Sequence, residues 1–487
     1  MSAGDRAVDL SLISHTNVGK TTLARTLLER NVGEVRDAPH VTATAEPHVM
    51  IETPEGDVLR LWDTPGFGDS ARLAKRLGQS GNPIGWFLSE VWDRWRDRPF
   101  WSSQQAVRNV REQADVVLYL VSAAEDPVDA GYVEPEMRIL EWIGKPAIAL
   151  LNQVGEPRPR ALEQAEEARW RTHLARYSFV REVLALDAFA RCWVQEMALL
   201  RAVGTALPAA KRPALARLAA AWQERRMAAF EASIEALASH LARAACDREP
   251  VDERGLRAQL RELLSRDGEP SANDRAAARL AERLDADVRM TTDRLIEIHG
   301  LEGRASAEVL GRLAGDFAVA SRVSEGKAAV LGGLVSGALS GLAADLAAGG
   351  LTFGAGLLTG GLLGALGAAG LARGYNLVRG TAETAVRWSE EFLDGFFASA
   401  LLRYLAVAHY GRGRGEWAAA EHPVFWRDEV AAVLEARRAA LGVIWAERAG
   451  ECDPAKLAAA LRVELGAAAL DLLERLYPRA LESRPAR

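Results

Sequence analysis

The feature that most constrains this chain is a short loop between an apolar run and a helical segment near its N-terminus. Residues 7–13 form an apolar-rich run of the kind found in a buried parallel strand. Residues 14–21 follow with the sequence Ser-His-Thr-Asn-Val-Gly-Lys-Thr, and residues 22–29 continue with helix-forming types. A Gly-Lys-Thr sequence between a strand and a helix is typical of a loop whose backbone N–H groups bind phosphate.

The residues of this loop have separate expected roles. We expect Lys20 to neutralise the β- and γ-phosphates of a nucleotide and the Thr21 hydroxyl to ligate Mg²⁺. The first glycine usual in such a loop is Ser14 here. A tight turn tolerates serine if φ stays negative, so we interpret the loop as a variant. The loop residues expected to contact the nucleotide are Asn17, Val18, Gly19, Lys20, Thr21 and Thr22.

A second motif follows at a suitable distance. Residues 48–53 and 58–62 alternate apolar and polar types around Pro-Glu-Gly-Asp, which predicts a β-hairpin that runs into Asp63-Thr64-Pro65-Gly66. An aspartate at the end of a strand can hold the Mg²⁺ shell, and the N–H of Gly66 can sense a γ-phosphate. In the intervening loop, residues 39–44, Thr42 is expected to complete the metal sphere, with Thr44 as the second choice.

Further apolar runs predict an α/β domain with an open, mostly parallel sheet. Residues 115–121 and 147–151 are two such runs, separated by a helical segment at 135–143, and residues 183–186 are expected to form the last strand. Parallel sheets bind ligands at the carboxyl ends of their strands, where Ser14, Asp63 and Asn152 would all lie.

These motifs, in this order, resemble the P-loop GTPases of the TrmE–Era–EngA–YihA–septin-like group over about residues 5–190. The whole chain is similar to bacterial members that carry a long C-terminal helical domain of unknown function. The resemblance implies GTP/GDP and Mg²⁺ as cofactors and a hydrolytic reaction. It assigns the phosphate, metal and switch roles to Lys20, Thr21, Thr42, Asp63 and Gly66.

The base-reading motif of that group, Asn-Lys-x-Asp, is altered in this chain. Residues 152–155 read Asn-Gln-Val-Gly, so the aspartate that accepts two hydrogen bonds from guanine is missing. Losing such a contact costs about 1–3 kcal/mol of base discrimination. Glu156 could substitute by a shift of one residue. We expect Asn152 and Gln153 to line the base side, with Asn152 alternatively holding the loop, and we favour GTP over ATP.

The hydrolytic step is expected to be slow without assistance. The position that often carries a water-orienting glutamine is Phe67, and a phenyl ring cannot orient water by hydrogen bonding. In the resembled group an asparagine placed as Asn17 coordinates K⁺ near the phosphates. We therefore expect K⁺-assisted hydrolysis completed by pairing of two GTPase domains in a homodimer. The alternative is that Asn17 only shapes the loop.

A long insertion at residues 67–114 separates the second motif from the next strand. It carries aromatic residues interleaved with arginines, which favours anchoring of a switch region on a neighbouring domain over stacking on nucleic-acid bases. Its position makes it the expected relay of nucleotide state. The residues are Trp86, Phe87, Trp92, Arg94, Trp95, Arg96, Arg98, Phe100 and Trp101.

The rest of the chain is expected to be mainly helical, because alanine becomes frequent and apolar residues recur at three-to-four spacing. We expect domains at 1–190, 191–325, 326–374 and 375–487, with a long helix over 378–410 and further helices over 425–480. The histidines at 173, 240, 299 and 409 stand isolated and are interpreted as surface or core residues. The cysteines at 192, 246 and 452 lie far apart, which argues against a disulfide framework or a zinc site.

One segment differs sharply from the helices around it. Residues 328–372 contain a single charge, Asp345, and two series of glycines spaced by four positions. Such a run has the length of two short membrane crossings, and small-residue stripes allow close helix packing in lipid. Basic residues on both flanks fit a hairpin that enters and leaves on the cytoplasmic side. The alternative is a Gly/Ala-rich hairpin buried inside a soluble bundle.

The composition sets limits on partners and compartment. The net charge of −6, with 60 Lys+Arg against 66 Asp+Glu, gives no basis for a DNA partner. The N-terminal residues lack the apolar core of a signal peptide, so we expect a cytoplasmic protein, peripheral or hairpin-anchored at the inner face of the cell membrane. The sequence predicts a GTP-hydrolysing switch that acts through a membrane-associated helical domain. The alternatives are a soluble scaffold with a degenerate head, and a ribosome- or RNA-associated GTPase.

Overall fold

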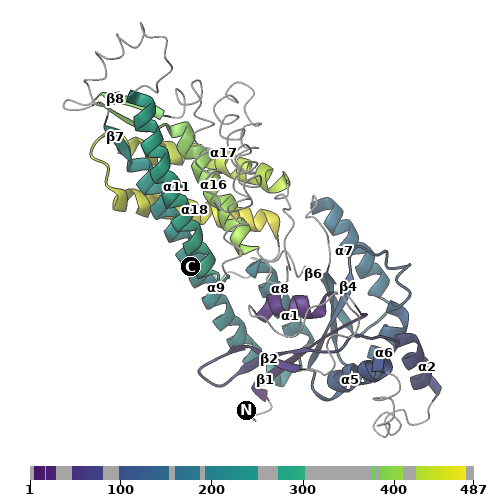
Figure 1. Cartoon of the computed structure of the whole chain (residues 1–487). Coiled ribbons are helices and arrows are strands. Elements are labelled where there is room, and N and C mark those ends of the chain that lie inside the picture. Colours follow the sequence, from purple (N-terminus) through teal and green to yellow (C-terminus); the bar gives the residue numbers. More distant parts are fainter. Residues whose placement is uncertain are drawn as a thin grey trace. The chain divides into compact units, whose positions relative to one another are not determined.

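The computed structural model describes residues 5–16, 18–28, 46–79, 98–152, 160–186, 192–250, 272–301, 375–379, 384–409 and 424–478. The chain divides into two units (Figure 1). Unit 1 comprises Met1–Met227, His409–Glu416 and Tyr477–Arg487, and unit 2 comprises Ala228–Ala408 and Trp417–Leu476. The two units are defined by contacts between residues and do not test the four domains expected from the sequence, which stay a prediction.

Unit 1 is built around a six-stranded sheet with the order β2-β3-β1-β4-β5-β6. Strand β2 pairs antiparallel with β3, and all other neighbours are parallel. The predicted hairpin and the predicted mostly parallel sheet are therefore confirmed. The strands are β1 (Ala7–Ser14), β2 (Glu46–Glu52), β3 (Val58–Asp63), β4 (Val116–Ser122), β5 (Ala147–Asn152) and β6 (Val180–Ala185).

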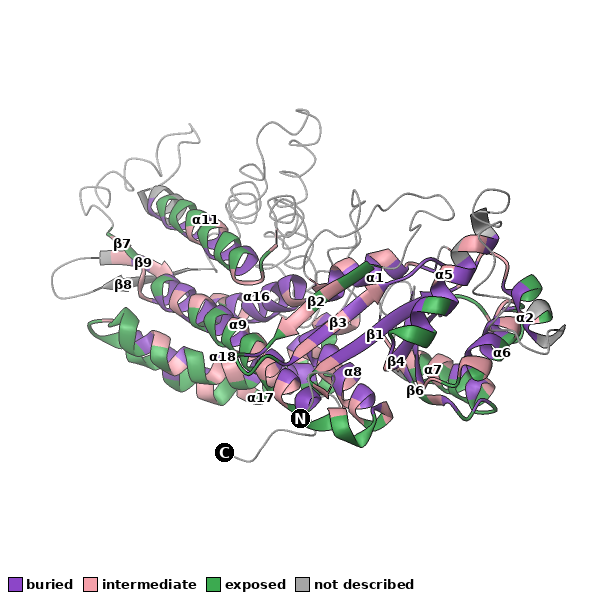
Figure 2. Ribbon diagram, turned by 90° about the horizontal axis from the view of Figure 1, so that it is seen from below, coloured by how far each residue is buried: buried purple, intermediate pink, exposed green. Residues whose placement is uncertain are grey.

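Helices cover both faces of this sheet, so its central strands are buried on both sides. In β4, Val117 and Tyr119 enter one core and Leu118 and Leu120 enter the other, as the two-residue period of a strand requires. Strands β1 and β4 are accordingly buried along almost their whole length (Figure 2). The helices are α1 (Lys20–Leu28), α2 (Ser70–Gln79), α5 (Arg98–Glu112), α6 (Val133–Ile143), α7 (Arg160–Leu174), α8 (Trp193–Ala206), η2 (Ala209–Lys211) and the first part of α9 (Arg212–Cys246).

Unit 2 is mainly helical and also contains a small antiparallel sheet with the order β7-β9-β8. Helix α16 is the most apolar of its helices and is buried along most of its length (Figure 2). The elements are the rest of α9, β7 (Arg248–Pro250), α11 (Ala272–Ile298), β8 (Tyr375–Arg379), β9 (Thr384–Trp388), α16 (Glu390–Ala408), α17 (Val424–Ala446), η4 (Glu447–Ala449) and α18 (Pro454–Leu476).

The long helix predicted over 378–410 is wrong at its start, because a β-hairpin occupies the first part of that range. Val386 and Trp388 are buried at alternate positions of β9, a strand pattern within a sequence that also fits a helix. The helix begins only at Glu390, where the Ser389 hydroxyl accepts a hydrogen bond from the N–H of Phe392 at 3.1 Å. A serine in that position caps a helix N-terminus and marks its true beginning.

The expectation against disulfides is also wrong, because Cys246 and Cys452 form one. The two residues are 206 positions apart in the sequence, yet their Cα atoms lie 5.5 Å apart. Cys246 ends α9, and Cys452 lies in the loop before α18. Such a pairing depends on how helices pack in unit 2, so sequence spacing alone does not reveal it. The third cysteine, Cys192, is buried and free, and burial raises the pKa of its thiol to about 12.

The apolar run at 328–372 lies outside the described residues. None of the helices in the described ranges has the length and apolarity needed to cross a membrane.

A buried ion pair joins α8 to the first part of α9 and provides a test of how unit 1 is held together. The Glu196 carboxylate accepts hydrogen bonds from Trp222 Nε1 at 2.7 Å and from Arg226 Nε and Nη2 at 2.9 and 3.0 Å. Replacing Glu196 with alanine leaves a largely buried guanidinium without this partner. We expect a loss of about 3 kcal/mol in the free energy of local unfolding.

The measurement is native-state hydrogen exchange of the α8 and α9 amides, because two units need not unfold in a single transition. Glu224→Ala, at an exposed position of α9, is the matched control and should change that free energy by less than about 0.5 kcal/mol. Equal exchange in the Glu196→Ala variant and the unmodified protein would contradict the structural role of the pair.

Candidate nucleotide-binding site

The predicted phosphate-binding loop connects the end of β1 to the start of α1. Gly19 has a φ of 93°, a left-handed conformation that favours glycine, and its carbonyl accepts the first helical hydrogen bond of α1, from Leu23 at 3.0 Å. Lys20 follows as the first residue of the helix and is buried. Its Nζ donates to the Ser14 hydroxyl at 3.1 Å, so the variant first position of the loop contacts the lysine directly.

Two of the three predicted metal-binding side chains, Thr21 and Asp63, meet at this loop. Thr21 Oγ1 donates a hydrogen bond to Asp63 Oδ2 at 2.8 Å, across a sequence separation of 42 residues. The other carboxylate oxygen, Oδ1, is buried and has no hydrogen-bond partner within the described ranges. Burial raises the pKa of Asp63, and the charge of Lys20 and the hydrogen bond from Thr21 oppose that rise.

A hydroxyl oxygen beside a carboxylate with an unpartnered oxygen is a donor set that fits Mg²⁺, which prefers hard oxygen ligands. No group of three His, Cys, Asp or Glu side chains able to hold a metal occurs in the described part of the chain. Thr21 and Asp63 alone would leave most of the coordination sphere open. This matches a metal that is bound largely through the phosphates of a nucleotide.

Gly66 approaches the loop so closely that a side chain would not fit. A Cβ atom at this position would lie 2.9 Å from Lys20 Nζ and 3.2 Å from Thr16 Cα. The lysine end could move, but the backbone at Thr16 is part of the loop itself. The structure therefore places the predicted phosphate sensor directly against the predicted phosphate-binding loop.

Phe67 is a structural anchor in this site. Its N–H donates to the Ser14 carbonyl at 2.9 Å, and its own carbonyl accepts from Thr16 Oγ1 at 2.9 Å. The ring is fully buried in one of the two cores of unit 1. A side chain in that position cannot orient a water molecule, as expected from the sequence.

Asn152, at the end of β5, forms a hydrogen bond with the phosphate-binding loop. Its Nδ2 donates to the carbonyl of Val18 at 2.7 Å, and the residue is fully buried at the end of β5. Of the two roles considered for Asn152, the structure contains the contact that the loop-holding role requires.

A buried polar network lies behind the loop and was not predicted from the sequence. Glu136 of α6 is fully buried and accepts hydrogen bonds from Tyr119 at 2.7 Å and from His15 Nδ1 at 2.9 Å. The His15 ring also stacks on Tyr132, with 4.5 Å between ring centroids. Burial raises the pKa of Glu136, and the contacts from His15 and Tyr119 oppose that rise.

Glu136 also acts on the loop lysine through its charge. Burial lowers the pKa of Lys20, and the negative charges of Asp63 and Glu136 oppose this shift. Glu136 lies in the first turn of an amphipathic helix, where an acidic residue is common, so its position alone could not distinguish it from a solvent-exposed residue. A contact across 121 residues to His15 is visible only in the fold.

Several predicted residues lie outside the described part of the chain. These are Asn17, Thr42, Thr44, Gln153 and Glu156, together with Trp86, Phe87, Trp92, Arg94, Trp95 and Arg96 of the insertion. Their expected roles stay predictions.

Part of the insertion at 67–114 is described. Phe100 of α5 is fully buried in a core of unit 1, and the guanidinium of Arg72 lies 4.5 Å from its ring centroid. The Gly68 N–H donates to Ser103 Oγ at 3.0 Å. For Phe100 the expected anchoring on a neighbouring domain is therefore wrong. This ring packs within its own unit, because α5 lies on the sheet together with α2 and α6.

Two family models match the chain. Residues 9–153 match the family described as 50S ribosome-binding GTPase, and residues 171–449 match a domain of unknown function, DUF3482. None of the curated proteins matches.

Solved structures of GTP-binding proteins resemble part of the chain. An Aquifex aeolicus Era variant bound to GDP.AlF4⁻ is 17% identical, with a TM-score of 0.31, and covers 42% of this chain and 57% of its own. Era in complex with MgGDPNP and a 16S ribosomal RNA segment has the same values. A bacterial selenocysteine-specific elongation factor is 14% identical, with a TM-score of 0.24, and covers 37% of this chain and 25% of its own. The chain thus spans little more than half the length of the Era structures.

The sheet topology, the loop around Lys20, the Thr21–Asp63 contact and the match over residues 9–153 define the first part of this chain as a P-loop GTPase domain. The DUF3482 model covers more than half of the chain. The chain belongs to the DUF3482 family. In this chain the DUF3482 domain follows the GTPase domain.

The buried network behind the loop leads to a prediction about Glu136. Replacing it with leucine removes the acceptor of His15 and Tyr119. Hydrogen bonds to a charged group contribute about 1.5–3 kcal/mol, so we expect nucleotide affinity to fall roughly tenfold or more. Isothermal titration with GDP measures the change.

Two further variants make this test specific. Glu136→Gln keeps one acceptor oxygen and should lose less affinity than Glu136→Leu. Glu134 lies in the same helix, is exposed and forms an ion pair with Arg138 on that helix, so Glu134→Gln should leave affinity unchanged. Full GDP affinity in the Glu136→Leu variant would show that the network does not position the loop.

Proposed function

We propose that the protein is a GTP-binding and GTP-hydrolysing switch in which the nucleotide state of the GTPase domain controls a helical, membrane-associated effector region. The observation that carries the nucleotide part is the 2.8 Å contact between Thr21 Oγ1 and Asp63 Oδ2. It joins the two separate motifs that hold phosphate and metal in this class of protein.

The roles of the side chains follow from their positions. Lys20 would neutralise the β- and γ-phosphates, and a phosphate anion would favour its charged form against the effect of burial. Thr21 and Asp63 would hold Mg²⁺, which supplies charge stabilisation at the phosphates when bound. The Gly66 N–H, packed against the loop, would report the presence of the γ-phosphate to the chain that follows it.

Slow turnover forms a second part of the proposal. Because the Phe67 ring is buried, no side chain at this position orients the attacking water. We propose that hydrolysis depends on K⁺ near Asn17 and on pairing of two GTPase domains. Selectivity for guanine is proposed to rest on weaker contacts than in relatives with the complete base-reading motif, because the Asn152 amide holds Val18.

The signal would leave the site through the chain after Gly66. The Gly68 N–H donates a hydrogen bond to Ser103 of α5, and the Phe67 N–H donates one to the phosphate-binding loop. A movement of Gly66 would therefore be transmitted to α5 through short, direct contacts. The apolar run at 328–372 supports membrane association of the effector region, by its length, its single charge and its basic flanks. We propose location at the inner face of the cell membrane on the same basis.

The second candidate function is association with the ribosome or RNA, favoured by the family description of residues 9–153. A soluble scaffold with little turnover is the third. RNA binding that weakens steeply with added salt would favour the second candidate. Nucleotide binding without measurable hydrolysis under any ionic condition would favour the third.

Phosphate release from GTP tests the enzymatic part. We expect slow release by the full-length protein with Mg²⁺, and at least a hundredfold loss in the Lys20→Ala variant, because the charge on the transferred phosphate is no longer neutralised. Lys456→Ala, at an exposed lysine of unit 2, is the control and should retain full activity. Release that survives Lys20→Ala would show that the activity arises elsewhere.

The same assay measures the dependence of turnover on K⁺ and the selectivity for guanine over adenine. Turnover should be faster in K⁺ than in Na⁺, and equal rates would remove the K⁺ hypothesis. Comparison of GTP with ATP measures the selectivity that remains without the aspartate of the base-reading motif.

Vesicle flotation tests the membrane part. We expect full-length protein to float with vesicles that contain anionic lipid, and protein without residues 328–372 to stay in solution, because that run supplies the apolar surface. Each protein is tested with GTP, GDP and ATP, and a difference between nucleotides would connect the two units functionally. Failure of the full-length protein to float with any nucleotide would sink the membrane proposal.

A further inference from the structure

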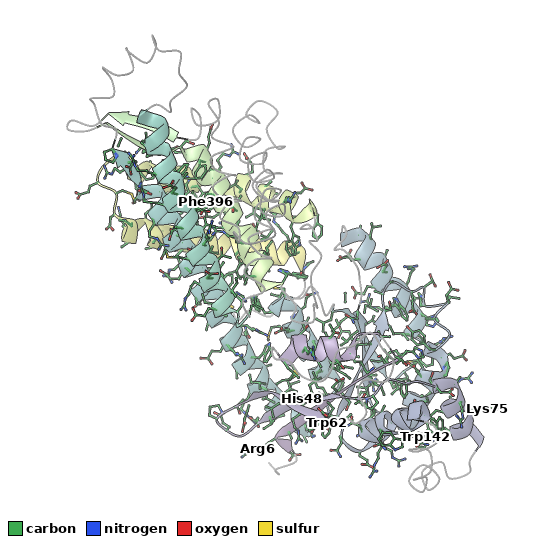
Figure 3. All side chains as sticks on the ribbon, in the orientation of Figure 1. Arg6, His48, Trp62, Lys75, Trp142 and Phe396 are labelled. Carbon is green, nitrogen blue, oxygen red and sulfur yellow. A yellow bond between two sulfur atoms is a disulfide. The ribbon has the colours of Figure 1, made fainter. Side chains whose placement is uncertain are left out.

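In unit 2 the guanidinium of one arginine is buried and has no hydrogen-bond partner among the described residues. Arg403 lies on α16, is fully buried, and none of its three side-chain nitrogens has a hydrogen-bond partner in the described part of the chain. Its guanidinium carbon lies 5.4 Å from the ring centroid of Phe396, two turns earlier on the same helix. Figure 3 labels Phe396. A cation over a ring face gains some energy but leaves all the N–H groups without acceptors.

A nearby acid does not compensate this charge. Asp287 of α11 is the group whose negative charge raises the pKa of Arg403. Its Oδ2 accepts from His240 Nδ1 at 2.7 Å, and its Oδ1 accepts from Arg243 Nη2 at 2.7 Å. Both oxygens are therefore engaged by other residues, and Asp287 is balanced by Arg243.

Among the described residues, the charges around Arg403 therefore leave one positive charge in excess. Burial lowers the pKa of Arg403 only to about 10, so the side chain stays charged near neutral pH. Burial lowers the pKa of His240 to about 4, so that ring is neutral there. An isolated buried charge costs several kcal/mol, and a native core normally holds it against an opposite charge.

A second polar atom next to the same phenyl ring is also unpartnered. His240 packs edge-on against Phe396, with 4.8 Å between ring centroids, and its Nε2 is buried with no hydrogen-bond partner among the described residues. Helices α9 and α16 thus each place an unpartnered polar group against Phe396.

Another buried arginine in unit 2, Arg448, donates hydrogen bonds to backbone carbonyls. Arg448 Nε donates to the Trp445 carbonyl at 3.2 Å, and its Nη1 donates to the carbonyls of Trp388 and Ala245 at 3.2 and 3.4 Å. The fold can therefore supply acceptors to a buried guanidinium, whereas at Arg403 no described residue supplies one.

We propose that Arg403 forms a binding site for a small free oxyanion inside unit 2, where Nε2 of neutral His240 can accept a hydrogen bond from the hydroxyl of a protonated ion such as hydrogen phosphate. The planar guanidinium offers parallel N–H groups that match two oxygens of a phosphate or carboxylate. A free ion is favoured over a group on a macromolecule, because Arg403 and His240 both have no exposed surface. The proposal is independent of the nucleotide site, whose residues belong to unit 1.

The test is hydrogen exchange of the α16 amides in the full-length chain, with phosphate, sulfate or acetate against chloride at equal ionic strength. All proteins carry Lys20→Ala, so that phosphate at the nucleotide site does not contribute. With Arg403 intact, an anion at ten times its dissociation constant should slow global exchange about tenfold. Arg403→Met should abolish this response, and without oxyanion its α16 should exchange more slowly, because the unpaired charge is gone.

Arg448→Met is the matched control. It removes a buried guanidinium that already has acceptors, so it should speed exchange while the anion response persists. Absence of slowing by all three oxyanions with Arg403 intact, or an unchanged response in Arg403→Met, would overturn the proposal.

Equilibrium dialysis with labelled phosphate covers the case in which Arg403→Met does not fold. The Lys20→Ala protein should bind one phosphate per chain, and binding of none would overturn the proposal. In the same experiment Arg403→Lys keeps the charge but loses the parallel N–H groups, so it should bind phosphate at least tenfold more weakly.

Discussion

The nucleotide site depends on keeping a lysine charged at a place where water has almost no access. Burial lowers the pKa of Lys20, and two carboxylates oppose this from different elements, Asp63 at the end of β3 and Glu136 on α6. Gly66 lies against the side chain of Lys20, and Phe67 is hydrogen-bonded to the loop, so both residues fix the chain after β3 beside the lysine. The loop is thus held by electrostatics as well as by backbone geometry, which makes residues far from the phosphates part of the site.

Much of the GTPase domain could be predicted from the sequence, because its signals are local. A strand that is buried on both faces is a continuous apolar run, and a phosphate loop has a fixed spacing, so β1, β4 and β5 were recognisable. The rule that parallel strands place their carboxyl ends at one edge predicted Asp63 beside the phosphate-binding loop, where Thr21 contacts it. The His15–Glu136–Tyr119 network was not predictable, because three ordinary residues from separate segments form it.

In unit 2 the sequence signals were weaker. A short alternating strand such as β9 also fits the apolar pattern of a helix, and only the capping contact of Ser389 identifies the boundary. Arg403 lies in a helix of apolar residues, where one arginine would normally extend its charged end to the surface. Whether the charge of Arg403 is paired depends on side chains of neighbouring helices. The spacing of residues along the chain therefore does not predict it.

The disulfide between Cys246 and Cys452 has a topological consequence for the apolar run at 328–372. The run lies between the two cysteines in the sequence, so it belongs to a covalently closed ring of the chain. Cutting the backbone once anywhere within that ring opens it without separating the pieces, which stay joined through sulfur. The ring is closed at Cys246 and Cys452, whose Cα atoms lie 5.5 Å apart in unit 2, so a single cleavage within the run would release no part of the chain until the disulfide is reduced.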